Sequence, residues 1–177
     1  MPNGTVRFDL EEGVATVTLD RPESLNSMND DLMQDLSSAL SAIEENENVR
    51  VAVITGAGRG FCSGADLNNA AESDSDISNV TPAFSETDFF NPALRSLHQC
   101  PVPTIARVNG VAAGGGLGIA LACDLQIAIR STFFVATFGP RLGIVPDMGS
   151  TWSLPRRAAT RTQRPSPAGR PGRSGGG

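Results

Sequence analysis

The chain has 177 residues, of which 40% are hydrophobic, so it can form one domain with a buried core. Its net charge of −5 is unevenly distributed: residues 1–155 carry 8 arginines against 19 acidic residues, a net charge of −11, and the other 6 arginines all follow residue 155. This acidic body argues against nucleic acid as the main partner. The chain has no lysine and one histidine, which excludes a Schiff-base lysine, a Walker A lysine and a histidine-rich metal site.

Three further features indicate the cellular context. No apolar run is long enough to cross a bilayer, and the first residues have neither the basic nor the apolar region of a secretory signal. The three cysteines, Cys62, Cys100 and Cys123, are widely spaced. Their odd number favours reduced thiols over a disulfide framework or a zinc site. The sequence therefore predicts a cytoplasmic protein with no membrane partner and no structural metal.

The first third of the chain has the pattern of a β-hairpin followed by a helix and a strand. Apolar residues alternate over residues 6–10 and 15–19, on either side of Glu11-Glu12-Gly13, which predicts two strands joined by a turn. Asn29 is a favourable N-cap for a helix with apolar residues at helical spacing. These apolar residues are Leu32, Leu36, Leu40 and Ile43. The β-branched run 49–55 then predicts a buried strand.

Strands and helices continue to alternate in the rest of the body, and a polar, acidic segment, 69–88, is expected to form a loop. The further elements expected are a helix before Cys100 with Leu94 and Leu97 on its buried side, an extended segment at 104–108, a turn at Asn109-Gly110, a helix at 114–123 and a buried strand at 125–129. Strand–helix–strand alternation with short links favours an α/β fold with right-handed crossovers.

Residues 156–177 differ from the body in composition, because they are rich in Arg, Pro, Gly and Ser and show no apolar periodicity. Such a segment is expected to be disordered, so we divide the chain into a folded core, 1–155, and a tail, 156–177. Three interpretations of the tail stay open: a solvated basic tail, a contact with nucleic acid or membrane, and out-of-frame translation of GC-rich DNA after Pro155. The DNA sequence beyond codon 155 distinguishes the third interpretation from the other two.

Two glycine-rich stretches, each after an expected strand, are the strongest candidates for chemistry. The first is GFCSGADL at residues 60–67, and the second is NGVAAGGGLG at residues 109–118. The second opens a helix, whose first N–H groups lack internal partners and lie at its positive end. Two such donors converging on one point form an oxyanion hole, and glycine lets a ligand approach the backbone closely. A glycine run by itself is equally typical of a helix packed closely on a sheet.

Five segments, taken in order, resemble the signature segments of the enoyl-CoA hydratase/isomerase (crotonase) family. They are RPESLNSM at 21–28, FCSGADL at 61–67, CPVPTIARVNG at 100–110, the glycine triplet at 114–116 and CDL at 123–125. The resemblance extends from about Val6 to Arg156. It implies the family's fold, a spiral of ββα turns, here without the C-terminal helical region, because the chain ends where those helices should begin.

The resemblance also implies roles for individual residues. The two backbone amides that hold the thioester oxygen fall on Ala65 and Gly115. The positions that flank coenzyme A or line its adenine and pantetheine path are Glu23, Ser24, Leu25, Ser63, Asp66 and Leu67. No metal and no permanently bound cofactor is implied, since coenzyme A arrives as part of an acyl-CoA substrate. The family's homotrimers and hexamers are built by the C-terminal helices.

Two positions depart from the hydratase pattern. Hydratases of the family carry a glutamate three residues after the second oxyanion glycine, where this chain has Gly118, and a second glutamate in a Pro-Glu pair, where residues 138–143 read FGPRLG. One acid remains nearby, Asp147, and isomerases of the family use an aspartate in a similar segment. A single carboxylate can move a proton between carbons without adding water. Aspartate is also a favourable N-cap for a helix expected to begin near Met148, so both roles stay open.

Two other residues have simpler interpretations. His98 is expected on a helix surface, because a lone histidine is rarely a ligand by itself. Cys62 lies near the expected pocket, but no activating partner is identified for it. Two functions are therefore carried forward. One is an acyl-CoA enzyme that stabilises a thioester enolate in a backbone oxyanion hole and isomerises or hydrates an enoyl-CoA. The alternative is a catalytically inactive remnant that binds CoA esters.

Overall fold

The computed structural model describes residues 1–66, 87–137 and 148–162. Its helices and strands, in chain order, are β1 (Val6–Glu11), β2 (Val14–Leu19), the 3-10 helix η1 (Pro22–Ser24), α1 (Asp30–Glu44), β3 (Val51–Gly56), β4 (Gly60–Cys62), α3 (Thr87–His98), β5 (Thr104–Val108), β6 (Val111–Ala113), α4 (Gly115–Ala122), β7 (Leu125–Ala128), β8 (Phe134–Val135) and α5 (Ser150–Thr162). No helix within these ranges is long and apolar enough to cross a membrane.

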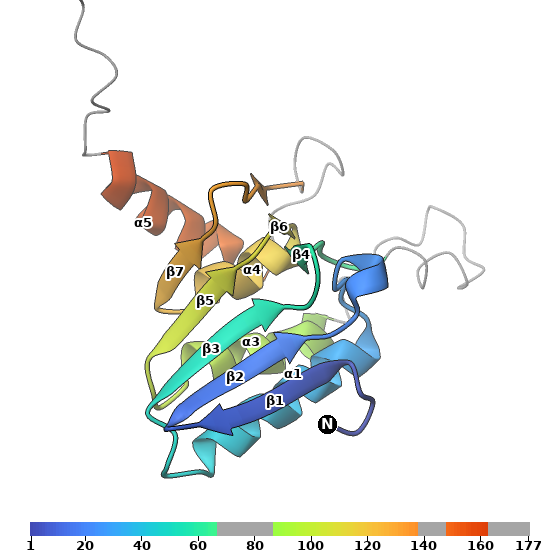
Figure 1. Cartoon of the computed structure of the whole chain (residues 1–177). Coiled ribbons are helices and arrows are strands. Elements are labelled where there is room, and N and C mark those ends of the chain that lie inside the picture. Colours follow the sequence, from blue (N-terminus) through green and yellow to red (C-terminus); the bar gives the residue numbers. More distant parts are fainter. Residues whose placement is uncertain (67–86, 138–147, 163–177) are drawn as a thin grey trace, which may run out of the picture.

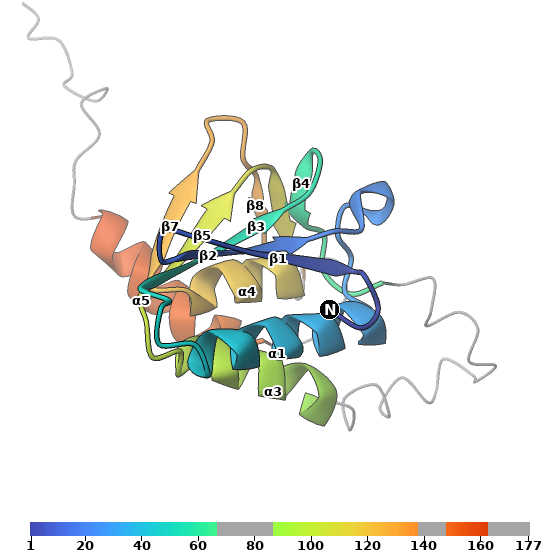
Figure 2. The same cartoon turned by 60° about the horizontal axis from the view of Figure 1, so that its bottom comes forward.

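The strands form two sheets with the helices on one side of the larger sheet. The larger sheet has the strand order β1-β2-β3-β5-β7, and the smaller has the order β4-β6-β8. Figures 1 and 2 show α1, α3, α4 and α5 together on one face of the five-stranded sheet. Every strand pair is parallel except the β1–β2 hairpin. The expected α/β fold with strand–helix alternation is confirmed.

The N-terminal elements follow the local patterns of the sequence. Glu12 and Gly13 form the hairpin turn, and both have positive φ angles, 49° and 84°, which match the twist of a two-residue hairpin loop. The side chain of Asn29 accepts a hydrogen bond from the N–H of Leu32 at 3.0 Å, so Asn29 caps α1 as expected. The four apolar residues expected on the inner face of α1 are all buried in the core.

Strand β7 differs from its expected environment. The run 125–129 was predicted to be a buried strand, and it does pair with β5, but Leu125 and Ile127 are 58% and 61% exposed. Within the described residues β7 is the last strand of its sheet. An apolar run predicts burial only if other elements cover it, and none of the described elements covers Leu125 and Ile127. The prediction of a strand at this position is therefore confirmed, but the prediction that the strand is buried is wrong.

Helix α5 crosses the boundary that the composition predicted between Pro155 and Arg156, since it continues as far as Thr162. The Arg157 guanidinium donates to the carbonyl oxygens of Cys123 at 2.6 Å and Asp124 at 2.9 Å. These carbonyls follow the last turn of α4, where backbone oxygens lack helical partners. Arg157 thus fixes α5 against the end of α4 by polar contacts, which apolar periodicity cannot reveal. Residues 163–177 lie outside the described residues.

Candidate active site

The two glycine-rich stretches meet in the structure, as expected for a shared site. Gly64 has a φ of +96°, and a Cβ atom added to it would lie 2.9 Å from the carbonyl oxygen of Ala113 and 3.5 Å from the amide nitrogen of Gly115. A Cβ atom at Gly116 would similarly overlap the backbone oxygen of Cys62. The backbone after β4 therefore lies directly on the first turn of α4. Only residues without side chains permit this approach.

Ala65 is held in an orientation set by its neighbours. Ala65 forms a parallel bridge with Met28, in which the Met28 N–H donates to Gly64 at 2.8 Å and the Asp66 N–H donates to Met28 at 2.9 Å. In a parallel ladder the residues before and after the bridged one make these bonds, so the N–H of Ala65 points away from Met28. No hydrogen bond from this N–H is formed within the described residues.

Gly115 is the first residue of α4, and its N–H is one of those at the start of a helix that have no intrahelical acceptor. Gly114 precedes it with a φ of +51° and provides no side-chain cap. The Gly114 N–H donates to the carbonyl oxygen of Val135 at 3.0 Å, which anchors the turn to β8. The amide of Gly115 therefore lies at the positive end of a buried helix, next to Gly64.

The predicted coenzyme A positions around η1 lie beside the segment that follows β4 and carries Ala65. The Ser63 N–H donates to the carbonyl oxygen of Leu25 at 3.0 Å, and the Ser63 hydroxyl donates to that of Ser24 at 3.0 Å. Glu23 lies on η1 with an exposed side chain. The structure thus brings these four predicted residues together. Leu67, the last residue of the predicted set, lies outside the described residues.

Asp66 has structural partners that the sequence did not indicate. Its carboxylate forms an ion pair with Arg21 at 2.9 Å and accepts a hydrogen bond from the Ser27 hydroxyl at 3.0 Å. The Asp66 side chain is only 7% exposed, and that of Arg21 is 18% exposed. The carboxylate therefore faces the interior. Arg21 was not predicted as a site residue, because 45 positions separate it from Asp66 and no local pattern connects them.

Met148 occupies the space beside the first turns of α4. A Cβ atom added to Gly118 would overlap the Met148 Cβ and would lie 2.8 Å from the Met148 carbonyl oxygen. A Cβ atom added to Gly115 would lie 3.3 Å from the Met148 Cγ. Asp147 lies outside the described residues, but the residue that follows it in the chain is therefore next to both Gly115 and Gly118.

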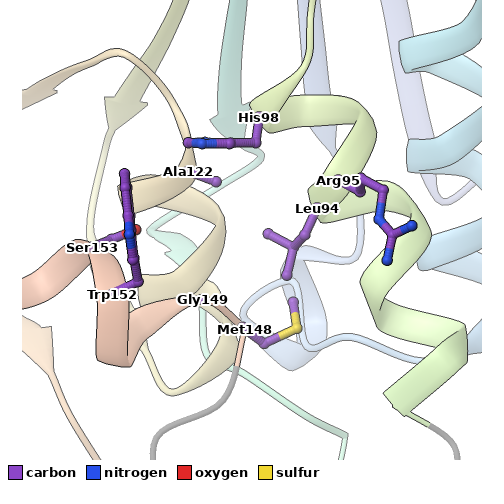
Figure 3. A pocket seen from close by; sticks show the side chains of 8 residues that line it. All are labelled: Leu94, Arg95, His98, Ala122, Met148, Gly149, Trp152 and Ser153. Atoms are coloured by element: carbon purple, nitrogen blue, oxygen red, sulfur yellow. The ribbon is translucent and has the colours of Figure 1, made fainter.

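A cavity of about 360 Å³ opens between α3, α4 and α5 (Figure 3). Its lining residues are Leu94, Arg95, His98, Ala122, Met148, Gly149, Trp152 and Ser153. The exposed position expected for His98 is confirmed, and its ring meets that of Trp152 edge-on, with 5.6 Å between the ring centroids. The Arg156 guanidinium lies 4.2 Å from the centre of the Trp152 ring on α5. Met148 lines this cavity and also lies next to Gly115.

The cysteines provide no nucleophile in this region. Burial raises the pKa of Cys62 to about 12, although a hydrogen bond from the Gly64 backbone acts in the opposite direction. At neutral pH Cys62 is therefore a protonated, buried side chain rather than a reactive thiolate. Residues 1–66, 87–137 and 148–162 contain no cluster of three or more His, Cys, Asp or Glu side chains that could hold a metal ion.

Sequence and structure comparisons agree with this geometry. The sequence model of the enoyl-CoA hydratase/isomerase family matches residues 9–164, and the chain belongs to that family. Its fold is the α/β crotonase fold of solved relatives, including an enoyl-CoA hydratase from Polaromonas sp. JS666, with a TM-score of 0.77 and 32% identity over 86% of this chain and 58% of the other. The family match ends at residue 164, beyond the limit of about Arg156 expected for the resemblance.

Two curated relatives are similar along most of this chain. The chain is 46% identical over 153 residues to the 1,2-epoxyphenylacetyl-CoA isomerase of Escherichia coli K12, covering 84% of this chain and 56% of that protein. It is 40% identical over 153 residues to a probable enoyl-CoA hydratase of Rhodobacter capsulatus, covering 86% of this chain and 56% of that protein. The chain thus spans little more than half the length of these relatives.

Proposed function

We propose that this chain is an acyl-CoA enzyme that binds a coenzyme A thioester and stabilises its enolate. The thioester carbonyl oxygen accepts hydrogen bonds from the N–H groups of Ala65 and Gly115, one from each glycine-bearing turn. The observation that carries this proposal is the close approach of Gly64 to the first turn of α4, where a Cβ atom added to Gly64 would lie 3.5 Å from the amide nitrogen of Gly115. Donors fixed in this way stabilise the charge that develops on the oxygen without reorganising during the reaction.

Asp147 is the acid/base of the proposed reaction, a double-bond isomerisation. Its carboxylate removes a proton from the carbon next to the thioester of an enoyl-CoA, and the electron pair moves to the carbonyl oxygen to give a dienolate. The same carboxyl group then returns the proton to the γ-carbon, the far end of the original double bond, so the new double bond lies between the α- and β-carbons and no water is consumed. The position of Met148 beside Gly115 supports this assignment, since Asp147 precedes Met148 directly.

Isomerisation is favoured over hydration by position 118. Water addition requires the two glutamates that the family resemblance assigns to hydratases, and the first of these positions is a glycine here. Met148 fills the adjacent space, so no larger side chain fits at Gly118 without a backbone shift. The name of the Escherichia coli relative, an acyl-CoA isomerase, is consistent with this choice.

The substrate brings coenzyme A, and the proposed reaction uses no other cofactor. Glu23, Ser24, Leu25, Ser63, Asp66 and Leu67 are the residues proposed to flank or support the bound coenzyme A. A soluble thioester substrate and buried, protonated thiols fit a cytoplasmic enzyme. The family resemblance further leads us to propose assembly into trimers or hexamers.

A non-catalytic CoA-ester-binding role is the second candidate, and one observation favours it. Leu125 and Ile127 on β7 are exposed, so an apolar strand surface is left uncovered within the described residues. Gel filtration combined with an enoyl-CoA assay separates the two candidates. A trimer that turns over an enoyl-CoA supports the enzyme, whereas a monomer that binds acyl-CoA without turnover supports the binding role.

Asp147→Asn tests the acid/base assignment. The variant should lose isomerisation of an enoyl-CoA while calorimetry still detects binding of the same thioester. Asp9→Asn, a change to an exposed carboxylate on β1, is the matched control and should keep full turnover. Exchange of the proton next to the thioester with D2O, followed by mass spectrometry on a saturated acyl-CoA, measures enolate formation directly. Turnover by Asp147→Asn at the rate of the unchanged chain would remove Asp147 from the mechanism.

A further inference from the structure

Two peptide groups connect the guanidinium of Arg21 to the amide of Ala65. Arg21 donates to the carbonyl oxygen of Ser27 at 2.6 Å, and the N–H of that same peptide group, which belongs to Met28, donates to the carbonyl oxygen of Gly64 at 2.8 Å. The Gly64 carbonyl in turn shares its peptide group with the N–H of Ala65. Because a trans peptide group is planar, its C=O and N–H point in opposite directions. The direction of the Ala65 N–H thus depends on the Ser27–Met28 peptide.

The other branch of the Arg21 guanidinium reaches the residue after Ala65. Its second terminal nitrogen lies 2.9 Å from the Asp66 carboxylate, which also accepts from the Ser27 hydroxyl. Arg21 therefore binds one partner on each of the two chain segments that form the Met28–Ala65 bridge. A planar guanidinium with several fixed donors can hold two acceptors at once, which a lysine ammonium in the same place does less well.

The loop that carries Arg21 is itself fixed to β4. The Arg21 N–H donates to the Asn26 side chain at 2.9 Å, and the buried Asn26 amide donates to Gly60 at 3.0 Å and Phe61 at 3.2 Å. Leu25 and Asn26 both have left-handed backbone angles, with φ of 55° and 57°. Such a conformation persists where surrounding contacts over-determine it, so the guanidinium starts from a rigid base.

We infer that Arg21 is a positioning residue for the Ala65 amide, an inference that rests on the function proposed above. Arg21 holds the Ser27–Met28 and Gly64–Ala65 peptide groups in one orientation, so that the Ala65 N–H is directed at the thioester oxygen before substrate arrives. Its positive charge also polarises this chain of hydrogen bonds, which strengthens the final donor. Arg21 itself touches neither substrate nor the reacting atoms.

The test measures the carbonyl stretch of a bound, unreactive acyl-CoA labelled with 13C at the thioester carbon, together with kcat and KM for an enoyl-CoA. Strong donors lower the stretching frequency, so the frequency reports the Ala65 and Gly115 amides directly. In Arg21→Met the frequency should move back towards its value in water, and kcat should fall by about tenfold to a hundredfold, short of the loss expected for removing an oxyanion donor entirely. KM should change less than kcat, because Arg21 reaches the proposed coenzyme A positions only through its ion-pair partner Asp66.

Arg7→Met is the matched control, since Arg7 forms an ion pair with Asp20 at 2.7 Å, next to Arg21 in the chain, and is not part of the hydrogen-bond chain that leads to Ala65. It should leave the frequency and kcat unchanged. Arg21→Lys and the double variant Arg21→Met/Asp66→Asn guard against misfolding caused by a buried carboxylate that has lost its cationic partner. Arg21→Lys should give an intermediate frequency and kcat.

The outcomes separate this inference from the proposed function. If the unchanged chain binds acyl-CoA without any lowering of the carbonyl frequency, the oxyanion hole is wrong and the role of Arg21 falls with it. If the unchanged chain lowers the frequency and a folded Arg21 variant lowers it equally at full kcat, the proposed function stands and the positioning role of Arg21 is refuted. A fall in kcat with an unchanged carbonyl frequency also refutes it, because Arg21 would then act elsewhere.

Discussion

The Met148 carbonyl oxygen lies so close to Gly118 that a Cβ atom added to Gly118 would be only 2.8 Å from it. Any side chain at position 118 therefore has to displace backbone, not merely the end of a flexible side chain. We expect Gly118→Glu to give no hydration of an enoyl-CoA and to lower the free energy of unfolding by about 1–3 kcal/mol, as overpacking usually does. Denaturant unfolding and loss of the conjugated thioester absorbance measure the two effects.

Met148→Gly is the companion variant for this prediction. Met148 has a φ of +50°, which glycine adopts without strain, so the substitution removes the overlapping Cβ and suits the backbone. Combined with Gly118→Glu it should recover part of the lost stability. Appearance of hydration in Gly118→Glu alone would show that the site adapts freely and that the space beside α4 does not select the reaction.

Gly64→Ala should separate the two turns that form the proposed site. The new Cβ would press on the carbonyl oxygen of Ala113, and the φ of +96° is unfavourable for alanine. We expect a loss of about 1–3 kcal/mol in the free energy of unfolding and a loss of enoyl-CoA turnover greater than that of any surface variant. Chemical denaturation and steady-state kinetics provide the measurements.

Gly4→Ala is the control that separates the effect of the steric contact at Gly64 from the effect of a positive φ angle. Gly4 has a similarly positive φ of +71°, but a Cβ atom there would meet nothing within 4 Å. Gly4→Ala should lower the free energy of unfolding by about 1 kcal/mol, the cost of placing alanine at a positive φ angle, and should keep full enoyl-CoA turnover. Equal losses of activity in Gly4→Ala and Gly64→Ala would contradict the assignment of a tight contact at Gly64.

The three thiols should react at very different rates with a disulfide reagent. Burial raises the pKa of Cys62 and of Cys123 to about 12, with the Asp124 charge contributing further at Cys123. Burial also raises the pKa of Cys100, which is only partly covered. At pH 8 we expect Cys100 to react first, and the other two only as fast as the protein unfolds. Cys100→Ser should abolish the early phase; an early phase that persists would contradict this order.

Asp124 should stabilise the fold only above a low pH. Its carboxylate accepts from the Thr104 N–H at 2.8 Å and the Thr104 hydroxyl at 2.9 Å. These bonds, chiefly the one from the Thr104 backbone, lower the pKa of Asp124 from 3.8. A lowered pKa in the folded state gives stability that is present above pH 3.8 and is lost as the pH falls through the folded-state value.

Asp124→Asn measures this contribution. The difference in free energy of unfolding between the unchanged chain and the variant should be constant from pH 5 to 7 and should shrink below pH 3.8. A constant difference down to pH 2 would mean that the Asp124 carboxylate is not the group that titrates.

The sequence correctly predicted those helices and strands that are determined by residues close to one another in the chain. Asn29 and the apolar repeat after it define α1 because capping and helical spacing act within a few residues. The exposure of Ile127 could not be predicted, because burial depends on what packs against a strand. The approach of the two glycine-rich stretches to one another was expected from the family resemblance. The ion pair between Arg21 and Asp66 was not, since it depends on distant segments meeting in three dimensions.

The bonds from Arg157 to the carbonyl oxygens of Cys123 and Asp124 have a consequence for the smallest unit that can fold. Trp152 and Ser153 form one wall of the cavity beside α4, and both belong to the helix that Arg157 fastens. A chain shortened to residue 155 would retain every apolar residue of that wall and lose the cation that keeps it in place. The C-terminal limit of the folded unit is therefore defined by a charged side chain and the two backbone oxygens to which it donates, and not by the last hydrophobic residue.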